Sequence, residues 1–466
     1  MNVLFSFKQV QTFLTILVMM IFSFLDASAD TSSLLIKDLG EGHCLVQINT
    51  NQRYLLLPVE EVMPDVRVSM IVNNKEVNVA DVRLAVNRVD YFVPLDLSAY
   101  AGKNILLKFK LGSNDPIRGK LSAVCCKEMK LSDTFDTGNR EKFRPTYHFS
   151  PLYGWMNDPN GMVYKDGEYH LFYQYNPYGS KWGNMSWGHA ISQDLVNWKH
   201  LPVAIAPDAL GTIFSGSAVV DFDNTAGFGA GAIIAIYTQN SDRQVQSIAY
   251  STDNGRTFTK YENNPVLTSE ARDFRDPKVF WYESTKRWIM VLAVGQEMQI
   301  FSSPNLKDWT FESRFGEGQG AHGGVWECPD LFELPVEGTN DKKWVLLCNL
   351  NPGGPFGGSA TQYFVGTFNG KEFVNVVFMD ETFWLTQVGM AELFDSSKSN
   401  VSEHLSHIFE EEELDKGSCM RKFGISEFST KPTHFYNLDA IIAVGYRVNS
   451  KKATRFRQWA TRTLKE

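Results

Sequence analysis

The sequence predicts an all-β protein in which a small β-sandwich precedes a β-propeller. Up to about residue 131, short apolar runs alternate with polar turns, which is typical of a small sandwich. Beyond that point a loose repeat of turns and apolar strands returns four times, as in propeller blades. Aromatic residues make up 13% of the chain, and most of them are expected in the cores of these strands.

The first 29 residues have the pattern of a secretory signal peptide. Lys8 precedes the apolar run FLTILVMMIFSFL, and the tripeptide ASA stands before Asp30 as a cleavage site. A membrane anchor is the alternative, but the run is shorter than the ~20 apolar residues that a spanning helix needs. We therefore expect a mature chain that is secreted, or held in the periplasm or at the cell surface, with no membrane-spanning segment after cleavage.

Residues 30–131 are predicted to form the accessory β-sandwich domain. Runs such as RYLLLPV, VRVSMIV and NILLKFKL have the length and spacing of strands, and the region contains no cluster of acids, histidines or nucleophiles. The charged, turn-rich residues 132–146 are predicted to be a linker.

Charge and cysteine content limit the possible partners. The net charge is −8 with a pI near 5.7 and no block of Lys or Arg, so nucleic acid is not an expected partner. Six cysteines spread over 466 residues do not make a disulfide scaffold, and no C-x-x-C pair suggests zinc. The sequence does not determine which cysteines, if any, pair with one another.

Residues 147–380 contain the repeat and are predicted to be the propeller domain. Four units begin at NDPNGMVYKDGEYHLFYQY, FSGSAVVDFD, FRDPKVFWYES and ECPDLFELPVEG. Three of them reach a similar polar hairpin, at SQDLVNW, STDNGRTF and SSPNLKDW, which begin at residues 192, 251 and 302. This spacing fits about four strands per unit.

Three acidic residues occupy the opening turns of these units. Equivalent turns of successive blades converge on the axis of a propeller. Asp158, Asp276 and Glu327 are therefore expected to face one another across one funnel. Taken singly, each has a plainer interpretation: a turn residue, a solvated partner of Arg275, and an edge-strand charge.

Carboxyl groups in this arrangement suit the cleavage of glycosidic bonds. One carboxylic acid protonates the leaving oxygen while a carboxylate attacks the anomeric carbon or activates water. Glu327 lies in the apolar segment VWECPDLFEL, which is expected to raise its pKa and make it the acid. Asp158 is expected to remain ionised if the Asn157 amide and backbone N–H groups donate to it.

Six motifs in this region resemble those of one enzyme family. WMNDPNG, FYQYNP, WGNMSWGHA, FSGSAV, FRDP and WECPDLF stand in the order and approximate spacing of glycoside hydrolase family 32, which contains levanases, inulinases and invertases. They cover roughly residues 145 to 375. The resemblance implies a propeller of the five-bladed type and a retaining double displacement that needs neither a metal nor a cofactor.

The resemblance also implies roles for individual residues. Asp158 is the implied nucleophile, Glu327 the acid that later acts as base, and Asp276 the residue that holds the fructose hydroxyls, with Arg275 fixing its position. The implied lining of the fructose pocket is Asn157, Gln174, Trp182 and Ser217, with Trp155 and Phe214 as its apolar wall. His189 and His322 are expected to be structural.

The end of the chain departs from the family pattern. After about residue 381 the strand alternation fades, and only DAIIAVGYRV reads as a strand. We therefore expect an incomplete last blade followed by an atypical tail, residues 381–466, of the kind that a truncated or frame-shifted gene would produce.

The leading hypothesis is a hydrolase that releases fructose from levan, inulin or sucrose. A catalytically impaired fructan-binding protein and a fructosyltransferase on the same fold are the alternatives. A sialidase-like propeller is suggested only by STDNGRTF, without the arginines that a sialic acid carboxylate would need. The preferred linkage, cleavage at chain ends or internally, and the oligomeric state remain open at this point.

Overall fold

The computed structural model describes residues 32–40, 42–111, 123–137, 142–354, 357–375, 377–379, 382–423 and 433–463. The predicted signal peptide, residues 1–29, lies outside the described residues. Two compact units are present: Met1–Val77 with Val82–Phe135, and Asn78–Asp81 with Asp136–Glu466. No helix in the described ranges has the length and apolar character needed to cross a membrane. All six cysteines lie within these ranges, and none forms a disulfide.

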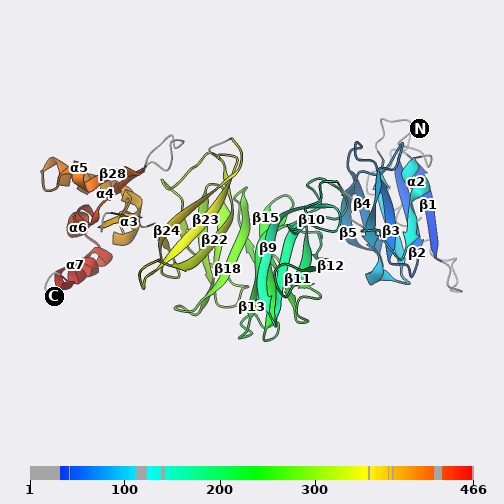
Figure 1. The fold of residues 1–466 in the computed structure, drawn as a ribbon, viewed down its shortest axis with the longest axis horizontal. Coiled ribbons are helices and arrows are strands. Elements are labelled where there is room, and N and C mark those ends of the chain that lie inside the picture. Colours follow the sequence, from blue (N-terminus) through cyan, green and yellow to red (C-terminus); the bar gives the residue numbers. More distant parts are fainter. Residues whose placement is uncertain are drawn as a thin grey trace, which may run out of the picture. The chain divides into compact units, whose positions relative to one another are not determined.

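The first unit contains two antiparallel sheets (Figure 1). Strand β4 shows why its sequence forms a strand: every second residue, from Val66 to Val72, is buried, and this period-two pattern places one face of the strand against the core. The larger sheet has the order β1 (Ser33–Gly40), β2 (His43–Asn49), β7 (Asn104–Lys110), β4 (Val66–Val72), β5 (Lys75–Val82), and the smaller has the order β6 (Tyr91–Asp96), β3 (Tyr54–Val59), β8 (Lys130–Ser132). The 3-10 helix η1 (Ser98–Tyr100) and helix α2 (Val124–Glu128) complete the unit.

In the second unit, each of the four predicted repeat units forms one antiparallel sheet (Figure 1). The first sheet consists of β9 (Trp155–Lys165), β10 (Glu168–Asn176), β11 (Ser186–Ser192) and β12 (Trp198–Ile205). The second consists of β13 (Thr212–Asp221), β14 (Ala232–Asn240), β15 (Gln244–Ser251), β16 (Thr259–Lys260) and β17 (Leu267–Thr268). The third consists of β18 (Phe274–Tyr282), β19 (Arg287–Val294), β20 (Glu297–Ser303) and β21 (Thr310–Phe315). The fourth consists of β22 (Val325–Pro335), β23 (Lys342–Asn351), β24 (Ala360–Phe368) and β25 (Phe373–Asn375).

Successive sheets pack face to face through apolar side chains. On β19, Met290 and Leu292 pack in the core shared with the second sheet, whereas Ile289 and Val291 pack in the core shared with the fourth. A strand buried on both faces has no polar side, which explains the continuous apolar run WIMVLAV. The first strands of successive sheets lie side by side, with β13 against both β9 and β18, and β18 against β22. We call β9, β13, β18 and β22 the inner strands.

The three predicted polar hairpins share one hydrogen-bond pattern. In each, a Ser hydroxyl contacts the side-chain oxygen of the Asp or Asn two residues later, and that oxygen accepts backbone N–H groups of the turn. The pairs are Ser192–Asp194, Ser251–Asp253 and Ser303–Asn305. This local pairing satisfies turn amides that no strand partner can reach, so it recurs wherever the repeat recurs.

His189, expected to be structural, is buried on β11 against the ring of Phe172 at 4.1 Å between centroids. Its Nε2 lies 3.1 Å from Nδ1 of the buried His170. Burial, with a smaller effect of the His170 and Arg256 charges, lowers the pKa of His189 to about 3, so this ring stays neutral. The ring of His322 binds the Gly316 and Gln319 carbonyl oxygens.

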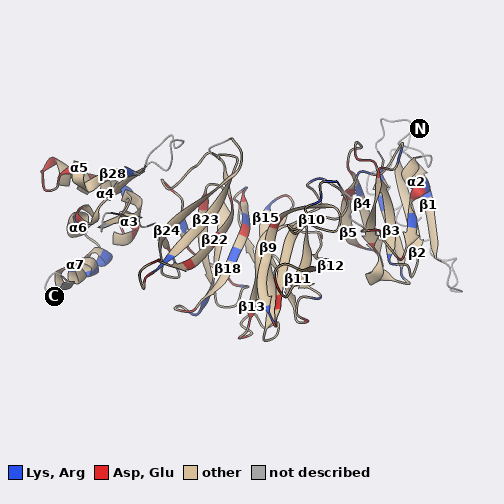
Figure 2. Ribbon diagram, viewed as in Figure 1, with Lys and Arg blue, Asp and Glu red and all other residues tan. Residues whose placement is uncertain are grey.

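The chain beyond residue 384 is mainly helical, and the predicted all-β class is wrong for this part. Its apolar core includes Phe394, Leu405 and Val444. The helices are α3 (Gln387–Phe394), α4 (Lys398–Glu410), α5 (Lys416–Cys419), α6 (Leu438–Arg447) and α7 (Lys451–Thr463), accompanied by the hairpins β26 (Val377–Met379) with β27 (Thr382–Trp384) and β28 (Met420–Phe423) with β29 (Thr433–Tyr436). Figure 2 shows Lys and Arg on α7, whose thirteen residues include no acid.

The strand predicted from DAIIAVGYRV is wrong, because this segment forms α6. The Asn437 side chain accepts a hydrogen bond from the Ala440 N–H and caps the helix. Ala440, Ile441 and Val444 are buried, so the apolar residues fall on one helical face. A short apolar run has no periodicity that separates a buried strand from a buried helix, and the cap was the signal that decides between them.

We predict that Asp253→Asn removes an acid-sensitive part of the protein's stability. Burial alone would raise the pKa of Asp253, but hydrogen bonds from Thr257 and Ser251 outweigh it and lower the pKa to about 2. The unfolded value is about 3.9, so the stabilisation is complete above pH 4 and disappears as the pH falls through 2. The variant should lose about 1 kcal/mol at pH 6, a figure reduced for solvent screening, and little near pH 2.

Thermal unfolding of wild type and variant across this pH range measures the effect. Asp242→Asn, in the loop between β14 and β15, is the control with the same change of charge. Equal losses at pH 6 and pH 2 would contradict the explanation.

Candidate active site

Each inner strand carries a β-bulge at the same end. At each bulge the inner strand advances three residues while the neighbouring strand advances two. A bulge bends its strand and re-aims side chains that regular alternation would send to opposite faces. The bulged pairs are Asn157–Asp158 on β9, Phe214–Ser215 on β13, Asp276–Pro277 on β18 and Cys328–Pro329 on β22.

The sequence contains the reason for these bulges. Proline directly follows Asp158, Asp276 and Cys328, and glycine follows Ser215. Proline has no N–H to give to a regular ladder, so within sheets it favours bulges and edges. A Cβ on Gly216 would lie 2.0 Å from the Ile236 carbonyl oxygen, so only glycine fits there.

Two of the bulged residues have left-handed backbone conformations. Asp276 has φ of 64° and Cys328 has φ of 46°, values that cost free energy for residues other than glycine. Hydrogen bonds hold both of them: the Asp276 N–H donates to Thr238 Oγ1 at 3.1 Å, and the Cys328 N–H donates to Asp276 Oδ2 at 3.0 Å. Backbone strain maintained in this way is typical of functional sites.

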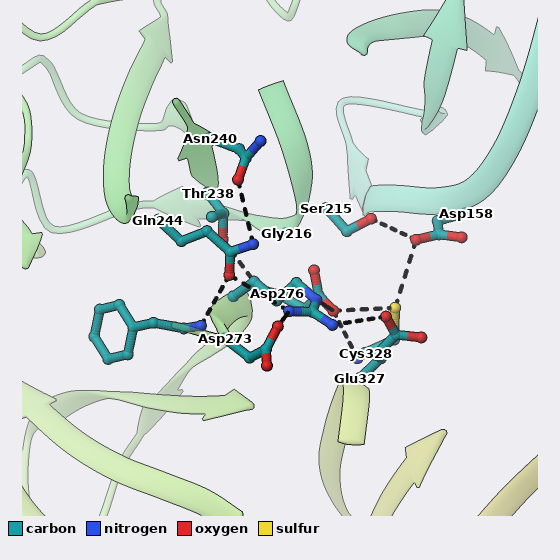
Figure 3. A network of polar contacts seen from close by, with 12 residues as sticks. Asp158, Ser215, Gly216, Thr238, Asn240, Gln244, Asp273, Asp276, Glu327 and Cys328 are labelled. Atoms are coloured by element: carbon teal, nitrogen blue, oxygen red, sulfur yellow. Dashed lines mark hydrogen bonds and ion pairs between the residues drawn. The ribbon is translucent and has the colours of Figure 1, made fainter. Parts of the chain in front are cut away.

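The bulges bring four side chains into one network (Figure 3). Ser215 Oγ donates to Asp158 Oδ2 at 2.6 Å, and Cys328 Sγ lies 3.6 Å from both Asp158 Oδ2 and Asp276 Oδ2. Asn157 Nδ2 donates to the other oxygen, Asp158 Oδ1, at 3.2 Å. Both oxygens of Asp158 therefore have donors, as expected for a carboxylate held in one orientation.

Asp276 is the most enclosed of the three acids. Only 7% of its surface is exposed, and burial raises its pKa to about 6, against the opposing effects of the Cys328 N–H and the Arg275 charge. The charges of Asp158 and Glu327 raise it further. A carboxyl group with such a pKa exchanges its proton near neutral pH, which is common among functional groups.

Glu327 is held by a cation and not by the expected apolar surround. Trp326 and Leu331 pack in the core between the third and fourth sheets. The group on Glu327 Oε1 is the Arg275 guanidinium, whose Nη2 donates at 2.9 Å. Counted from the proline that follows, Cys328 and not Glu327 matches the place of Asp158 and Asp276, so the predicted equivalence of the three acids is displaced by one residue.

The predicted pocket residues fall into two groups. Trp155 Nε1 donates to Asn157 Oδ1 at 2.9 Å, which links them to Asp158, and Gln174 is buried with no hydrogen-bond partner for its Nε2 among the described residues. The rings of Trp182 and Phe214 meet edge to face at 5.9 Å, and Trp182 remains 58% exposed.

Ser217 does not join these groups. Its hydroxyl donates to the Pro277 carbonyl oxygen and accepts from the Val279 N–H, so it ties β13 to β18. Ser215, from the same motif FSGSAV, makes the contact with Asp158 that was expected of Ser217. The signal for Ser215 was present in the sequence, because Gly216 takes the place that proline takes in the other three motifs.

Sequence reasoning also missed Cys328, Asp273 and Gln244. Cys328 was treated only as an apolar neighbour of Glu327. Asp273 accepts from Arg275 Nη1 at 2.6 Å, and Gln244 Oε1 accepts from the Phe274 N–H at 2.8 Å. No motif marks Asp273 or Gln244, because their roles depend on where neighbouring strands place them.

Comparison with family models decides the family. Residues 148–398 match the model described as the glycosyl hydrolases family 32 N-terminal domain, which covers more than half of the chain. The chain belongs to glycosyl hydrolase family 32. The match includes every residue of the network in Figure 3, from Asp158 to Cys328.

Two further models match outside the centre of this family 32 chain. Residues 40–147 match a domain of unknown function, DUF4980, and residues 420–466 match the Virulence protein RhuM family. The second match falls on the helical part of the chain, beyond the family 32 region.

Curated relatives of the family 32 region include enzymes from bacteria and fungi. A levanase of Bacillus subtilis (strain 168) is 63% identical over 50% of this chain and 36% of its own length. An extracellular exo-inulinase of Aspergillus awamori is 46% identical over 54% and 53%, respectively. The family 32 chain therefore spans about half the length, or less, of these relatives.

Solved structures of family 32 enzymes align over a similar part. The exo-inulinase of Aspergillus awamori is 45% identical with a TM-score of 0.49, over 52% of this chain and 53% of that one. A β-fructofuranosidase of Schwanniomyces occidentalis, complexed with fructosyl-erythritol, is 49% identical with a TM-score of 0.48, over 50% and 48%.

We predict that Asp276→Asn makes this family 32 chain more stable at pH 7. The folded pKa of Asp276, about 6, lies above the unfolded value, so ionisation opposes folding and stability falls as the pH rises from about 4 to above 6. An amide carries no such cost and still offers an oxygen to the Cys328 N–H. The gain should be at most about 3 kcal/mol at pH 7 and should vanish near pH 4.

Denaturant unfolding of both proteins at pH 4 and pH 7 measures this gain. Asp223→Asn, an exposed loop carboxylate, serves as the control. A variant less stable than wild type at pH 7 would show that the charge of Asp276 supports the fold.

Proposed function

We propose that this chain is a retaining β-fructofuranosidase that releases fructose from levan, inulin or sucrose. The observation that supports this most directly is the network of three acids from three sheets, in which Asp158 is oriented by Ser215 and Asn157 and Glu327 is held by Arg275. Retaining hydrolysis needs one carboxylate placed as nucleophile and a second carboxyl group placed as acid and base. The names of the relatives, levanase, exo-inulinase and invertase, support the three substrates.

The proposed reaction has two steps. In the first, an Asp158 oxygen attacks the anomeric carbon while Glu327 gives its proton to the glycosidic oxygen, so the bond to the leaving group breaks and a fructosyl ester forms on Asp158. In the second, Glu327 takes a proton from water, whose oxygen attacks the same carbon. Fructose leaves, and both carboxyl groups return to their starting states.

The other residues position the sugar and the nucleophile. Asp276 would accept hydrogen bonds from fructose hydroxyls, which strengthen as positive charge develops on the ring. The buried Gln174 amide would donate to a further hydroxyl and gain the partner it otherwise lacks. Trp155, Trp182 and Phe214 would offer aromatic surface to the sugar. Ser215 would take the role first expected of Ser217.

We also propose a domain organisation for the chain. The four sheets would be successive blades of a five-bladed-type propeller, residues 147–380, whose last blade is incomplete. The two sheets of the first unit would form an accessory β-sandwich, residues 30–131, joined by the linker 132–146. The matches at residues 40–147 and 148–398 support a boundary close to this linker.

An extracytoplasmic location fits this function. The signal-peptide pattern of residues 1–29 would direct the chain to secretion, the periplasm or the cell surface, where fructans occur as polymers. The relative from Aspergillus awamori is named an extracellular exo-inulinase, which supports the same direction. A fructan or sucrose would be the partner, without nucleic acid and without a spanning segment after cleavage.

The first test of the proposed function is fructose release by the mature chain from Asp30. Wild type should release fructose from at least one of levan, inulin and sucrose. Asp158→Asn should lower the rate at least about 1,000-fold, because an amide is no nucleophile for this carbon. Asp242→Asn should keep wild-type activity.

Circular dichroism and the melting temperature establish that both variants are folded. A folded wild type that binds levan without releasing fructose would replace the hydrolase by a fructan-binding protein. Transfer of fructose to a second sugar in place of water would indicate a fructosyltransferase.

A second test separates the roles of the two carboxyl groups. Glu327→Gln cannot protonate a leaving oxygen, so turnover of sucrose should fall by about 100- to 10,000-fold. An aryl fructoside with a good leaving group needs no such proton and should still fructosylate Asp158, after which the missing base leaves the ester in place. Mass spectrometry should detect one added fructosyl group on the peptide that contains Asp158. The same adduct in Asp158→Asn would assign the nucleophile elsewhere.

A further inference from the structure

Asp273 lies outside every motif but contacts the centre of the proposed site. It directly precedes β18, and as the residue two before Arg275 it projects on the same side of the strand. Its side chain is 30% exposed, whereas that of Arg275 is 12% exposed. The Gly295 N–H donates to the Asp273 carbonyl oxygen and anchors its backbone to the end of β19.

The Arg275 guanidinium joins Asp273 to Glu327 (Figure 3). Nη1 donates to Asp273 Oδ1 at 2.6 Å, while Nη2 donates to Glu327 Oε1 at 2.9 Å. Nε lies 3.9 Å from Asp276 Oδ2. The rigid fork of a guanidinium cannot turn one nitrogen without moving the other. The position of Asp273 therefore determines how the guanidinium meets Glu327.

We propose that Asp273 is a positioning residue that holds Arg275 against Glu327 and moderates the charge which Arg275 presents to it. This inference rests on the proposed function, in which Glu327 is the general acid. Asp273 itself touches neither the substrate nor the reacting atoms. It acts through Arg275 alone.

The charges around Glu327 fix the direction of the effect. Arg275 is the cation beside it, and the carboxylates of Asp276 and Asp158 and the thiol of Cys328 complete the surrounding titratable groups. Asp273 offsets part of the Arg275 charge. Without that offset, the cation favours the ionised form of Glu327, and the proton needed by the leaving group is lost at lower pH.

Two variants separate charge from anchoring. Asp273→Asn keeps an oxygen for Arg275 Nη1 but removes the charge, so the alkaline limb of the kcat/KM profile should move to lower pH by about half a unit. Asp273→Ala removes the anchor as well, so kcat should also fall about tenfold as the guanidinium shifts. Asp273→Glu restores a carboxylate and should recover the wild-type limb.

Glu270→Gln is the matched control. It removes the same charge three residues away, where the side chain is 88% exposed and pairs with Arg243. This variant should keep the wild-type profile. An Asp273→Asn profile that coincides with that of Glu270→Gln would overturn the proposal.

A readout without turnover distinguishes this proposal from the proposed function. In protein labelled with ¹³C at the Glu side-chain carboxyl, the Glu327 resonance is identified by its absence in Glu327→Gln. Its titration midpoint should lie lower in Asp273→Asn than in wild type, even if wild type releases no fructose. An unchanged midpoint would overturn the role of Asp273, whereas inactivity of wild type alone would overturn only the hydrolase.

Discussion

The bulge at one end of every inner strand is the constraint on which the site depends. In a regular strand, consecutive side chains point to opposite faces, so Arg275 and Asp276 could not both reach the carboxyl groups of the neighbouring sheets. The bulge and the left-handed φ of Asp276 turn both toward Glu327 and Cys328. Thr238, on the second sheet, supplies the hydrogen bond that holds this backbone in place. The strain is therefore borne by contacts between sheets.

The same contacts explain how several acids can share a small space. Arg275 neutralises part of their charge through Asp273 and Glu327, while Ser215 and the Cys328 N–H give hydrogen bonds to Asp158 and Asp276. The compensation is incomplete for Asp276, whose pKa of about 6 records the remaining cost of ionising it in a buried place. A site that retains such a cost has placed a charge for a purpose other than stability.

Much of this could be predicted from the sequence, because repetition makes local signals add up. The hairpins of Ser192, Ser251 and Ser303 gave the blade spacing, and the acids of three motifs gave the centre of the site. The choice between Ser215 and Ser217 could not be made, since a regular strand places both on one face and only the bulge separates them. The apolar text around Glu327 misled for a related reason: on a strand, sequence neighbours such as Trp326 point away. Asp273 and Gln244 were out of reach because no pattern encodes a contact between strands.

The helical part beyond residue 384 affects the site although it holds none of its acids. Thr386, which caps α3 through the Gly389 N–H, also accepts from Gln319 Nε2 at 2.9 Å. Gln319 lies in the loop before β22, and Asn375 donates to its other side-chain oxygen. In the same loop, the Ala321 carbonyl oxygen accepts from Trp326 Nε1, one residue before Glu327. The segment that follows the fourth sheet thus fixes the loop leading to the proposed acid, so the position of Glu327 depends on a part of the chain where the family 32 match ends.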